Sequence, residues 1–412
     1  MRAEPVMPDT ASPRRWLSIV GIGEDGVNGL SPVARGLVSR ADIVFGGERH
    51  LGLAASLIRG ETKPWPSPFS VGEVLAERGR QVCVLASGDP FFYGVGAVLA
   101  SHVSPEETLV VPAPSAFSLA AARLGWSLPE IVLVSLHGRA LDRIRPHLHP
   151  GARVLALTSD SDGPAHLARL LGEIGFGASR LTVLEALGGE HEQVRTTTAS
   201  SFDPTDIAPL NTVAIEVEAG PGARVIAFTP GLSDALFEHD GQITKREIRA
   251  ITLSSLAPLR GELLWDIGAG SGSVAIEWML ADPSMRAVAI ETHPDRAARM
   301  TRNAASFGVP GLEIVEGRAP EALAELPAPD AIFIGGGASD EGVLDAAIAA
   351  LRPGGRLVVN AVTLVTEALL IARYAAQGGE LVRIALTRAE PVGSKTGWRP
   401  ALPVTQWVWV KP

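Results

Sequence analysis

Short apolar runs alternate with amphipathic segments along nearly the whole chain, and this alternation sets the expected fold. In the first half, runs rich in Val, Ile and Leu predict strands at 16–23, 41–47, 81–87, 108–115, 131–138, 153–160, 180–188 and 211–218. Helical periodicity occupies the segments between the earlier strands, at 31–40, 49–58, 71–78, after Tyr93 and up to Leu124. Strands that alternate with helices predict a parallel sheet with both faces covered. The last strands of this half follow one another without helices, which predicts a mixed sheet in a second small α/β lobe.

The second half repeats the alternation with its own set of strands. The run that begins at Leu263 is followed by expected strands at 287–291, 313–317, 329–336, 356–362, 381–388 and 405–412, seven in all. Helices are expected at 297–307, 341–351 and 366–377. No helix separates the final two strands. The fold class of the whole chain is therefore predicted to be α/β.

The chain has 412 residues, more than one hydrophobic core usually supports, so several modules are expected. Pairs of Gly and Pro near residue 220 are typical of a linker. We expect a disordered tail at 1–15, a first domain at 16–219 with lobes at about 16–126 and 127–219, a linker at 220–237 and a second domain at 238–412.

Composition and charge restrict the partners. The formal charge of -9 argues against a nucleic-acid partner, which requires a basic face. No stretch approaches the ~20 apolar residues of a membrane span, and the N-terminal residues lack the apolar core of a signal peptide. The chain has a single cysteine, Cys83, and this excludes an intramolecular disulfide and a multi-thiolate metal site. Cys83 lies in an apolar run. We expect a cytoplasmic homo-oligomer with no metal site.

A glycine-rich loop follows the strand that begins at Leu263. Asp266 precedes three alternating glycines, Gly268, Gly270 and Gly272, which lead into an amphipathic helix. Glycines allow positive φ and close approach to a ligand, and the helix start offers free N–H groups. The spacing G-x-G-x-G differs from the dinucleotide pattern and resembles the first motif of class I S-adenosylmethionine (SAM) methyltransferases. A glycine-rich turn without a ligand is the alternative interpretation.

That resemblance implies a seven-stranded Rossmann-like sheet whose last strand is antiparallel, and it implies SAM as the cofactor. Glu291, at the end of the next strand, is expected to accept the ribose hydroxyls. The residues that the resemblance assigns to cofactor binding are Gly268, Ala269, Gly270, Ser271, Gly272, Glu291, Arg318 and Ala319.

Four loops in the first half follow predicted strand ends, where open α/β sheets bind ligands. They lie at 21–26, 86–96, 113–126 and 135–139, and in this order they resemble the tetrapyrrole (uroporphyrinogen III/precorrin) methylase family. The resemblance implies a bilobal fold with SAM in the cleft. Many relatives have Gly-Pro-Gly-Asp in the first loop, where this chain has Gly23-Glu24-Asp25-Gly26. The implied cofactor residues are Gly88, Asp89, Pro90, Tyr93, Ser115, Ser135, His137 and Gly138.

Thr244, in the segment before the glycine loop, has two possible roles: it caps a helix, or it caps the helix and also contacts the cofactor. Thr244 and Glu247 have the spacing of a capping box, in which each side chain bonds a backbone N–H. The segment 240–247 also resembles the precorrin decarboxylating methylase domain, which implies that Thr244 contacts the cofactor. A cap alone is the alternative.

A precorrin carries several carboxylates, so we expect arginines and lysines at its site. The candidates are Arg246 and Arg249 on the helix beside the cofactor, and Arg388, Lys395 and Arg399 on the loop before the final strand. Each is alternatively a solvated surface charge. Reduced tetrapyrroles have electron-rich meso carbons, so methyl transfer from SAM needs alignment more than a general base. Lys245, Arg246 and His137 are the candidate catalytic side chains.

Two SAM folds in this order resemble a bifunctional precorrin methylase family of cobalamin biosynthesis. The resemblance implies one SAM per domain, methylation of the precorrin at meso positions 5 and 15, and decarboxylation of the ring C acetate. The first half is expected to methylate position 5, and the second to decarboxylate and methylate position 15. The alternatives are an RNA methyltransferase, and a single active C-terminal methyltransferase served by a non-catalytic tetrapyrrole-binding N-terminal module.

Overall fold

The computed structural model describes residues 15–412, so the tail expected at 1–15 lies outside the described residues except for its last residue. Contacts divide the chain into two compact units, and each is described by itself. Unit 1 comprises the residues up to Arg139 together with His149–Arg224. Unit 2 comprises Ala140–Leu148 and Val225–Pro412.

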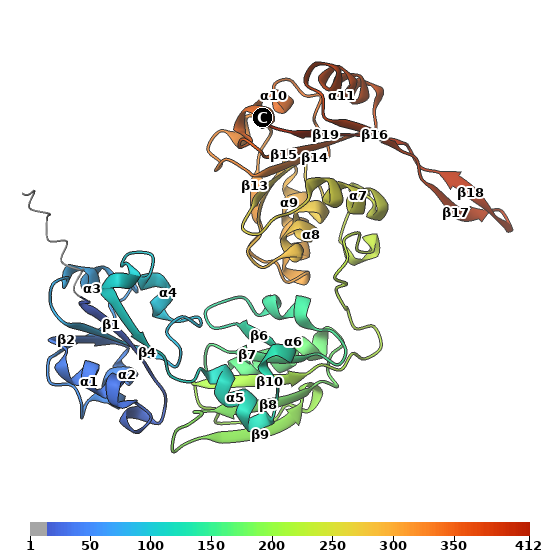
Figure 1. Ribbon diagram of the computed structural model, residues 1–412. Helices are drawn as coiled ribbons and strands as arrows, with labels where there is room; N and C mark the ends of the chain where they lie inside the picture. Colours follow the sequence, from blue (N-terminus) through green and yellow to red (C-terminus); the bar gives the residue numbers. More distant parts are fainter. Residues whose placement is uncertain (1–14) are drawn as a thin grey trace, which may run out of the picture. The chain divides into compact units, whose positions relative to one another are not determined.

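A five-stranded parallel sheet with the order β3-β2-β4-β1-β5 forms the first lobe of unit 1 (Figure 1). Its strands are β1 (Leu17–Ile22), β2 (Ile43–Gly46), β3 (Glu61–Pro64), β4 (Val82–Ser87) and β5 (Thr108–Val111). The helices are α1 (Pro32–Arg40), α2 (Glu48–Ala54), α3 (Gly72–Ala76) and α4 (Val95–Leu99). Alternate side chains of β1 enter two different cores, Ile19 on one face and Val20 on the other. The predicted parallel sheet, covered on both faces, is confirmed.

A mixed sheet with the order β6-β7-β10-β8-β9 forms the second lobe, as predicted. Only β6 and β7 pair in parallel within it. The elements are β6 (Val132–Ser135), β7 (Arg153–Leu157), β8 (Arg180–Glu185), β9 (Gln193–Thr198), β10 (Asn211–Glu216) and α6 (Gly163–Glu173). Strand β9 was not among the predicted strands. It lies at the edge of the sheet and is largely exposed, so its sequence lacks an apolar run.

Helix α5 (Ala116–Leu124) follows the first sheet in sequence but packs on the second. Its buried side chains Phe117, Ala120 and Ala121 share one core with Leu155 of β7 and Leu184 of β8. The lobe boundary expected at 126 therefore lies before α5. The apolar face of this helix explains the difference, since burial against the second sheet removes that face from water.

Unit 2 has a seven-stranded sheet with the order β13-β12-β11-β14-β15-β19-β16. The strands are β11 (Leu263–Ile267), β12 (Arg286–Glu291), β13 (Glu313–Glu316), β14 (Ala331–Ile334), β15 (Arg356–Ala361), β16 (Glu380–Ile384) and β19 (Val404–Val410). The first five are parallel, and β19 is antiparallel to both of its neighbours. The predicted antiparallel last strand is confirmed. The helices are α7 (Arg246–Leu256), α8 (Ser273–Ala281), α9 (Pro294–Ser306), α10 (Val343–Ala350) and α11 (Leu364–Gln377).

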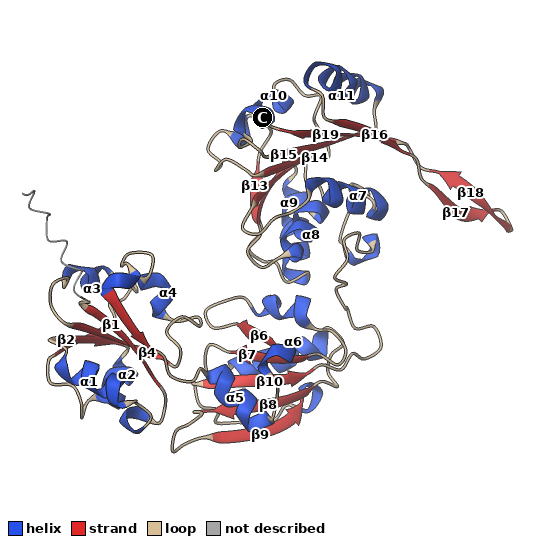
Figure 2. Ribbon diagram, viewed as in Figure 1, coloured by secondary structure: helices blue, strands red, loops and turns tan. Residues whose placement is uncertain are grey.

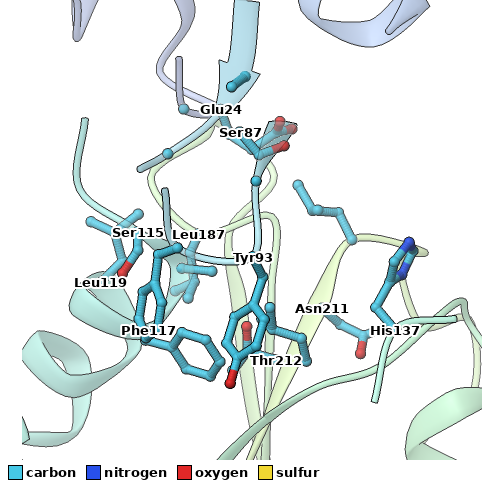
Figure 3. A pocket seen from close by; sticks show the side chains of 18 of the residues that line it. Glu24, Ser87, Tyr93, Ser115, Phe117, Leu119, His137, Leu187, Asn211 and Thr212 are labelled. Carbon is cyan, nitrogen blue, oxygen red and sulfur yellow. The ribbon is translucent and has the colours of Figure 1, made fainter. Parts of the chain in front are cut away.

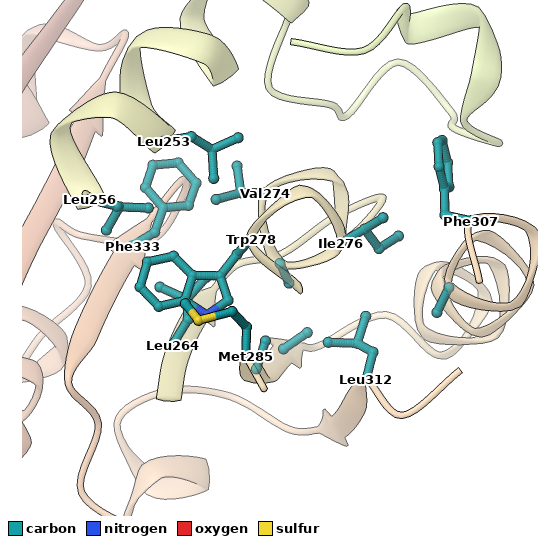
Figure 4. Close-up of a cluster of buried hydrophobic side chains, with 14 of the residues drawn as sticks. Leu253, Leu256, Leu264, Val274, Ile276, Trp278, Met285, Phe307, Leu312 and Phe333 are labelled. Carbon is teal, nitrogen blue, oxygen red and sulfur yellow. The ribbon is translucent and has the colours of Figure 1, made fainter. Parts of the chain in front are cut away.

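Both faces of this sheet are buried because successive side chains of each strand point in opposite directions. Leu264 and Phe333 belong to a core that includes Trp278 of α8 and Phe307 (Figure 4). Trp265, the neighbour of Leu264, belongs to the opposite core under α10 and α11. The sheet is thereby held between two layers of helices, and the carboxyl ends of β11, β12 and β14 are fixed at one edge.

Two segments of unit 2 differ from the expectation. Residues expected in the linker, including Leu232 and Phe237, are buried in the core with α8 and α9, so the second unit begins earlier than residue 238. The loop expected before the final strand is a hairpin of β17 (Thr387–Val392) and β18 (Lys395–Pro400), which extends from the sheet (Figure 2). Gly393, with φ +64, lies in the two-residue turn and provides the left-handed backbone that such turns favour. Within residues 15–412, every helix is too short or too polar to span a membrane.

Candidate functional sites

Unit 1 contains a pocket of about 380 Å³ lined by residues from both of its lobes (Figure 3). Five of the predicted cofactor residues line it: Gly88, Tyr93, Ser115, Ser135 and His137. The other three, Asp89, Pro90 and Gly138, are not among the lining residues. They shape the loops instead: the Asp89 carboxylate accepts the Phe91 N–H at 2.9 Å, the Pro90 carbonyl accepts the Gly96 N–H at 2.9 Å, and the Gly138 N–H donates to Ser159 Oγ at 2.9 Å.

The ends of β1, β4 and β5 meet at this pocket through very close backbone contacts. Gly88, with φ +53, donates its N–H to the Ile22 carbonyl at 3.1 Å and accepts from the Ala113 N–H at 3.1 Å. A Cβ placed on Gly21 would lie 1.9 Å from the Gly88 carbonyl oxygen. The two glycines are therefore required by packing of backbone against backbone, and they bring three strand ends to one place.

Aromatic rings cover one part of the pocket wall. Tyr93 has φ +59, which is rare for a residue with a side chain and marks a backbone held in place by its surroundings. Its ring lies 5.2 Å from Phe92 and 6.1 Å from Phe117 between centroids, and the Arg139 guanidinium lies 5.5 Å above it. His137 is held by the Thr158 carbonyl at 3.3 Å. Apolar and aromatic walls with a few fixed polar groups are typical of sites for large organic ligands.

A polar cluster in the same pocket was not predicted. It consists of Glu24, Arg49, His50 and Ser87. Arg49 pairs with Glu24, and its Nη2 lies 2.8 Å from His50 Nε2 and 3.0 Å from Ser87 Oγ. Burial, and secondarily the Arg49 charge, lower the pKa of His50 to about 4. The motif Gly-Gly-Glu-Arg-His directly after the second strand was the available signal, since strand ends of a parallel sheet carry ligand groups.

In unit 2 the glycine loop connects β11 to α8 as predicted. Gly268, Gly270 and Gly272 all have positive φ, at +71, +59 and +74. A Cβ on Gly268 would lie 2.9 Å from the Gly336 carbonyl oxygen, and one on Gly270 would lie 3.0 Å from the Gln242 carbonyl oxygen. The loop is thus packed between the end of β14 and the segment before α7.

Two polar atoms beneath this loop find no hydrogen-bond partner within residues 15–412. They are Asp266 Oδ1 and Ser271 Oγ, and both residues are buried. Asp266 accepts the Ala275 N–H at 3.1 Å through its other oxygen, and burial raises the pKa of this carboxyl to about 7. Buried polar atoms without partners are rare, and they are suited to contact with a polar ligand or its water. The donor and acceptor set of the loop fits SAM in this respect.

Glu291 connects the glycine loop to the end of β12. Its carboxylate is 4% exposed and accepts the N–H groups of Gly270, Thr292 and His293 at 2.8, 3.0 and 3.1 Å. It therefore fixes the loop, and ribose binding through its remaining lone pairs stays a prediction. Of the other residues assigned to cofactor binding, Ala319 is buried, and the exposed Arg318 pairs with Asp340 at 2.8 Å.

The expected substrate-binding residue Arg249 has a different role. Its side chain is completely buried and donates to Glu277 Oε1 at 2.6 Å and Asp234 Oδ1 at 3.1 Å. It also donates to the carbonyls of Leu232 and Thr244. All of its polar contacts hold the segment before α7 against α8, so the guanidinium is not accessible to a substrate carboxylate.

The expected capping box is absent, and the exposed cations near it have local partners. Helix α7 begins at Arg246 with Lys245 as its N-cap and no side-chain cap. Glu247 pairs with Arg388 of the hairpin instead, which removes it from the cap. Arg399 pairs with Glu390 at 3.2 Å on the same hairpin as Lys395. Lys245, Arg246 and the hairpin cations remain candidates for substrate binding, and Thr244 remains a candidate for cofactor contact.

Two family models match the chain, one in each half. Residues 17–203 match the family model of tetrapyrrole (corrin/porphyrin) methylases, and residues 235–411 match that of the precorrin methyltransferase domain. The chain is therefore a methyltransferase with two tetrapyrrole-type domains. It is 62% identical over 406 residues to the precorrin-6Y C(5,15)-methyltransferase (decarboxylating) of a Sinorhizobium species, with 98% of each chain covered. The chain belongs to the precorrin-6Y C(5,15)-methyltransferase (decarboxylating) family.

Two shorter relatives each match a part of the chain. The cobalt-precorrin-7 C(5)-methyltransferase of Salmonella typhimurium is 32% identical over 183 residues, which cover 43% of this chain and 88% of that protein. A probable cobalt-precorrin-6B C(15)-methyltransferase (decarboxylating) of Pyrobaculum calidifontis is 38% identical over 141 residues, which cover 33% of this chain and 72% of that protein. One of these two relatives is thus named for position C(5) and the other for position C(15).

Proposed function

We propose that this chain methylates a precorrin at meso positions 5 and 15 and removes carbon dioxide from its ring C acetate, with one SAM bound by each unit. The observation that carries the proposal is the presence, on one chain, of two different α/β units whose strand ends each form a glycine-shaped ligand loop. The division of labour, with unit 1 acting at position 5 and unit 2 at position 15, is supported by the separate relatives named for each reaction.

The residues of unit 1 that would hold SAM are Gly88, Tyr93, Ser115, Ser135 and His137, which line its pocket. In unit 2 they are the glycine loop, Glu291 and the segment around Thr244. When bound, SAM supplies an activated methyl group for an electron-rich carbon. The protein's contribution is to align that carbon, to hold the two loops rigidly and to exclude water, which lowers the entropic part of the barrier.

The proposal is tested with full-length protein in which one site at a time is blocked. Gly21→Ala places a Cβ against the Gly88 carbonyl in unit 1, and Gly268→Ala places one against the Gly336 carbonyl in unit 2. Gly172→Ala is the matched control, because a Cβ there meets no atom within 4 Å. Products from a reduced precorrin and SAM are weighed by mass spectrometry, and bound SAM is counted by calorimetry.

Wild type and Gly172→Ala are expected to add two methyl groups, to release one carbon dioxide and to bind two SAM per chain. Gly21→Ala should release carbon dioxide and add a single methyl group, whereas Gly268→Ala should do neither of the reactions assigned to unit 2. If Gly21→Ala still adds both methyl groups, unit 1 is a non-catalytic tetrapyrrole-binding module. If wild type leaves the tetrapyrrole unchanged, the proposed function is refuted.

The alternative of an RNA methyltransferase is disfavoured by the formal charge of -9. RNA binding that weakens steeply with salt would support it. We also expect a homo-oligomer in the cytoplasm, and sedimentation of the full-length protein tests the oligomeric state.

A further inference from the structure

The cluster of Glu24, Arg49, His50 and Ser87 lies in the unit 1 pocket but is not needed for any cofactor contact proposed above. Figure 3 shows Glu24 and Ser87 together at one end of the pocket, away from His137, Asn211 and Thr212. Among the described residues that line the pocket, Arg49 is the one with a permanent positive charge. A permanent charge in a largely apolar wall calls for an explanation, since its partial desolvation costs free energy.

The directions of the hydrogen bonds define the state of His50. Arginine nitrogens only donate, so the contact from Arg49 Nη2 at 2.8 Å requires a lone pair on His50 Nε2. The ring proton then lies on Nδ1, which is buried and has no partner within residues 15–412. Ser87 Oγ accepts from Arg49 Nη2 at 3.0 Å and lies 2.8 Å from the same Nε2, whose lone pair the Arg49 N–H already occupies. His50 is therefore a neutral spacer beside the guanidinium, and the cluster contains no free base.

Glu24 accounts for the orientation of the guanidinium. It accepts from Nη1, which leaves Nη2 directed at His50 and Ser87. The Arg49 side chain remains 38% exposed despite these contacts, whereas that of Glu24 is 21% exposed.

We propose that Arg49, oriented by Glu24 and flanked by His50 and Ser87, binds a carboxylate side chain of the tetrapyrrole in the unit 1 pocket. The inference rests on the proposed function, which supplies a polycarboxylate substrate. Guanidinium groups form charge-assisted hydrogen bonds with carboxylates. The contacts with Glu24, His50 and Ser87 use three of the five N–H groups of Arg49, which leaves the Nε and one Nη1 N–H for a substrate. The aromatic wall formed by Phe92 and Phe117 is suited to the macrocycle itself. Because Ser87 directly precedes Gly88 of the proposed cofactor loop, this anchor fixes one edge of the macrocycle near the methyl donor.

The test measures the methylation assigned to unit 1 on the full-length protein, with the decarboxylated monomethyl product of Gly21→Ala as substrate. Arg49→Gln is expected to raise the KM for this tetrapyrrole about 10- to 100-fold, the range for loss of a charge-assisted hydrogen bond. The KM for SAM and kcat should change less than about twofold, because Arg49 contacts neither the cofactor nor the reacting carbon. Arg123→Gln is the matched control, since it breaks an Arg–Glu pair outside the pocket.

Further variants separate binding from orientation and from misfolding. Arg49→Lys keeps the charge and should raise KM less than Arg49→Gln does. Glu24→Gln keeps a side-chain oxygen that can accept from Nη1 and so preserves the orientation of Arg49, while it removes the competing negative charge; KM should stay within about twofold of wild type or fall. If calorimetry still finds two SAM per chain, unit 1 of Arg49→Gln is folded. If it finds one, Arg49→Lys is used in its place, and a rise in its KM for the tetrapyrrole then tests the proposal.

Several outcomes overturn the proposal while leaving the proposed function intact. They are an unchanged KM in Arg49→Gln, a fall in kcat without a change in KM, a rise in the KM for SAM, and a KM in Glu24→Gln raised as much as in Arg49→Gln. The last would assign Arg49 a structural role that depends on its ion pair. A wild-type protein that adds no second methyl group refutes the proposed function itself.

Discussion

Replacing Arg249 by methionine is expected to destabilise unit 2 severely and to affect substrate binding only through that loss. The guanidinium is completely buried, and its partner Glu277 has a side chain that is 2% exposed. Removing the cation leaves Glu277 as a buried carboxylate that retains only the N–H groups of Gly231 and Leu232. Breaking a buried pair in this way costs about 3–5 kcal/mol of the free energy of unfolding.

Hydrogen–deuterium exchange on the full-length protein measures this loss for each segment. A decrease of about 4 kcal/mol raises the opening equilibrium roughly a thousandfold, so peptides from α7 and α8 should exchange faster by that factor. Peptides from unit 1 serve as the internal reference. Arg302→Met is the matched control, since Arg302 pairs with Glu238 on the surface and such pairs contribute about 1 kcal/mol or less.

The double variant Arg249→Met/Glu277→Gln completes the cycle. Its loss of stability should be smaller than the sum of the two single losses, because the second change removes the unpaired buried charge. If Arg249→Met keeps normal protection of α7 and α8 and instead raises the KM for the tetrapyrrole, the reasoning is refuted, and the role expected from sequence, a substrate ligand, is restored.

Three further predictions concern single buried groups. Burial raises the pKa of Asp266 from 3.8 to about 7, so between these pH values the folded state keeps a proton that the unfolded state loses. The free energy of unfolding of unit 2, measured by urea titration, should therefore fall by about 4 kcal/mol as the pH rises through this range. Asp266→Asn should not show this fall. Burial and Arg49 lower the pKa of His50 from 6.5 to about 4, so between these pH values the unfolded state binds a proton that the folded state does not. The free energy of unfolding of unit 1 should therefore fall by about 3 kcal/mol as the pH drops through this interval. An equal fall in His50→Gln would contradict this assignment. Burial raises the pKa of Cys83 to about 12, so a thiol reagent at pH 8 should label the protein only after urea unfolds it, and rapid labelling of native protein would show an accessible thiolate.

The features that sequence predicted well are those with a local cause. Continuous apolar runs identified nearly all of the buried strands, because both faces of a parallel sheet are covered by helices. The glycine loop was located because the positive φ of Gly268 and Gly270 permits few other residues. The loop at Gly88 was found through its position after a predicted strand and through the resemblance of the four ordered loops to the tetrapyrrole methylase family.

The features that sequence did not predict are of two kinds. Some depend on partners far away in the sequence, and others are strands that have few buried side chains. Strands β3 and β9 are edge strands with few apolar residues, so they gave no periodic signal. The burial of Arg249 follows from Glu277, a residue on another helix that no local pattern connects to it. Arg49 and Ser87 meet across two loops separated by 38 residues. The capping box had the right spacing, but the ion pair of Glu247 with the hairpin replaced it.

The position of β19 between β15 and β16 determines when unit 2 can fold during synthesis. The strand that completes the sheet is Val404–Val410, near the C-terminal end of the sequence, and until it is inserted both β15 and β16 present an unpaired edge. The sheet therefore closes only after Val410 has left the ribosome, whereas every strand of unit 1 precedes those of unit 2 in chain order and has already emerged. The nascent chain thus exposes two adhesive strand edges late in translation, and this interval is where a chaperone would protect it from aggregation.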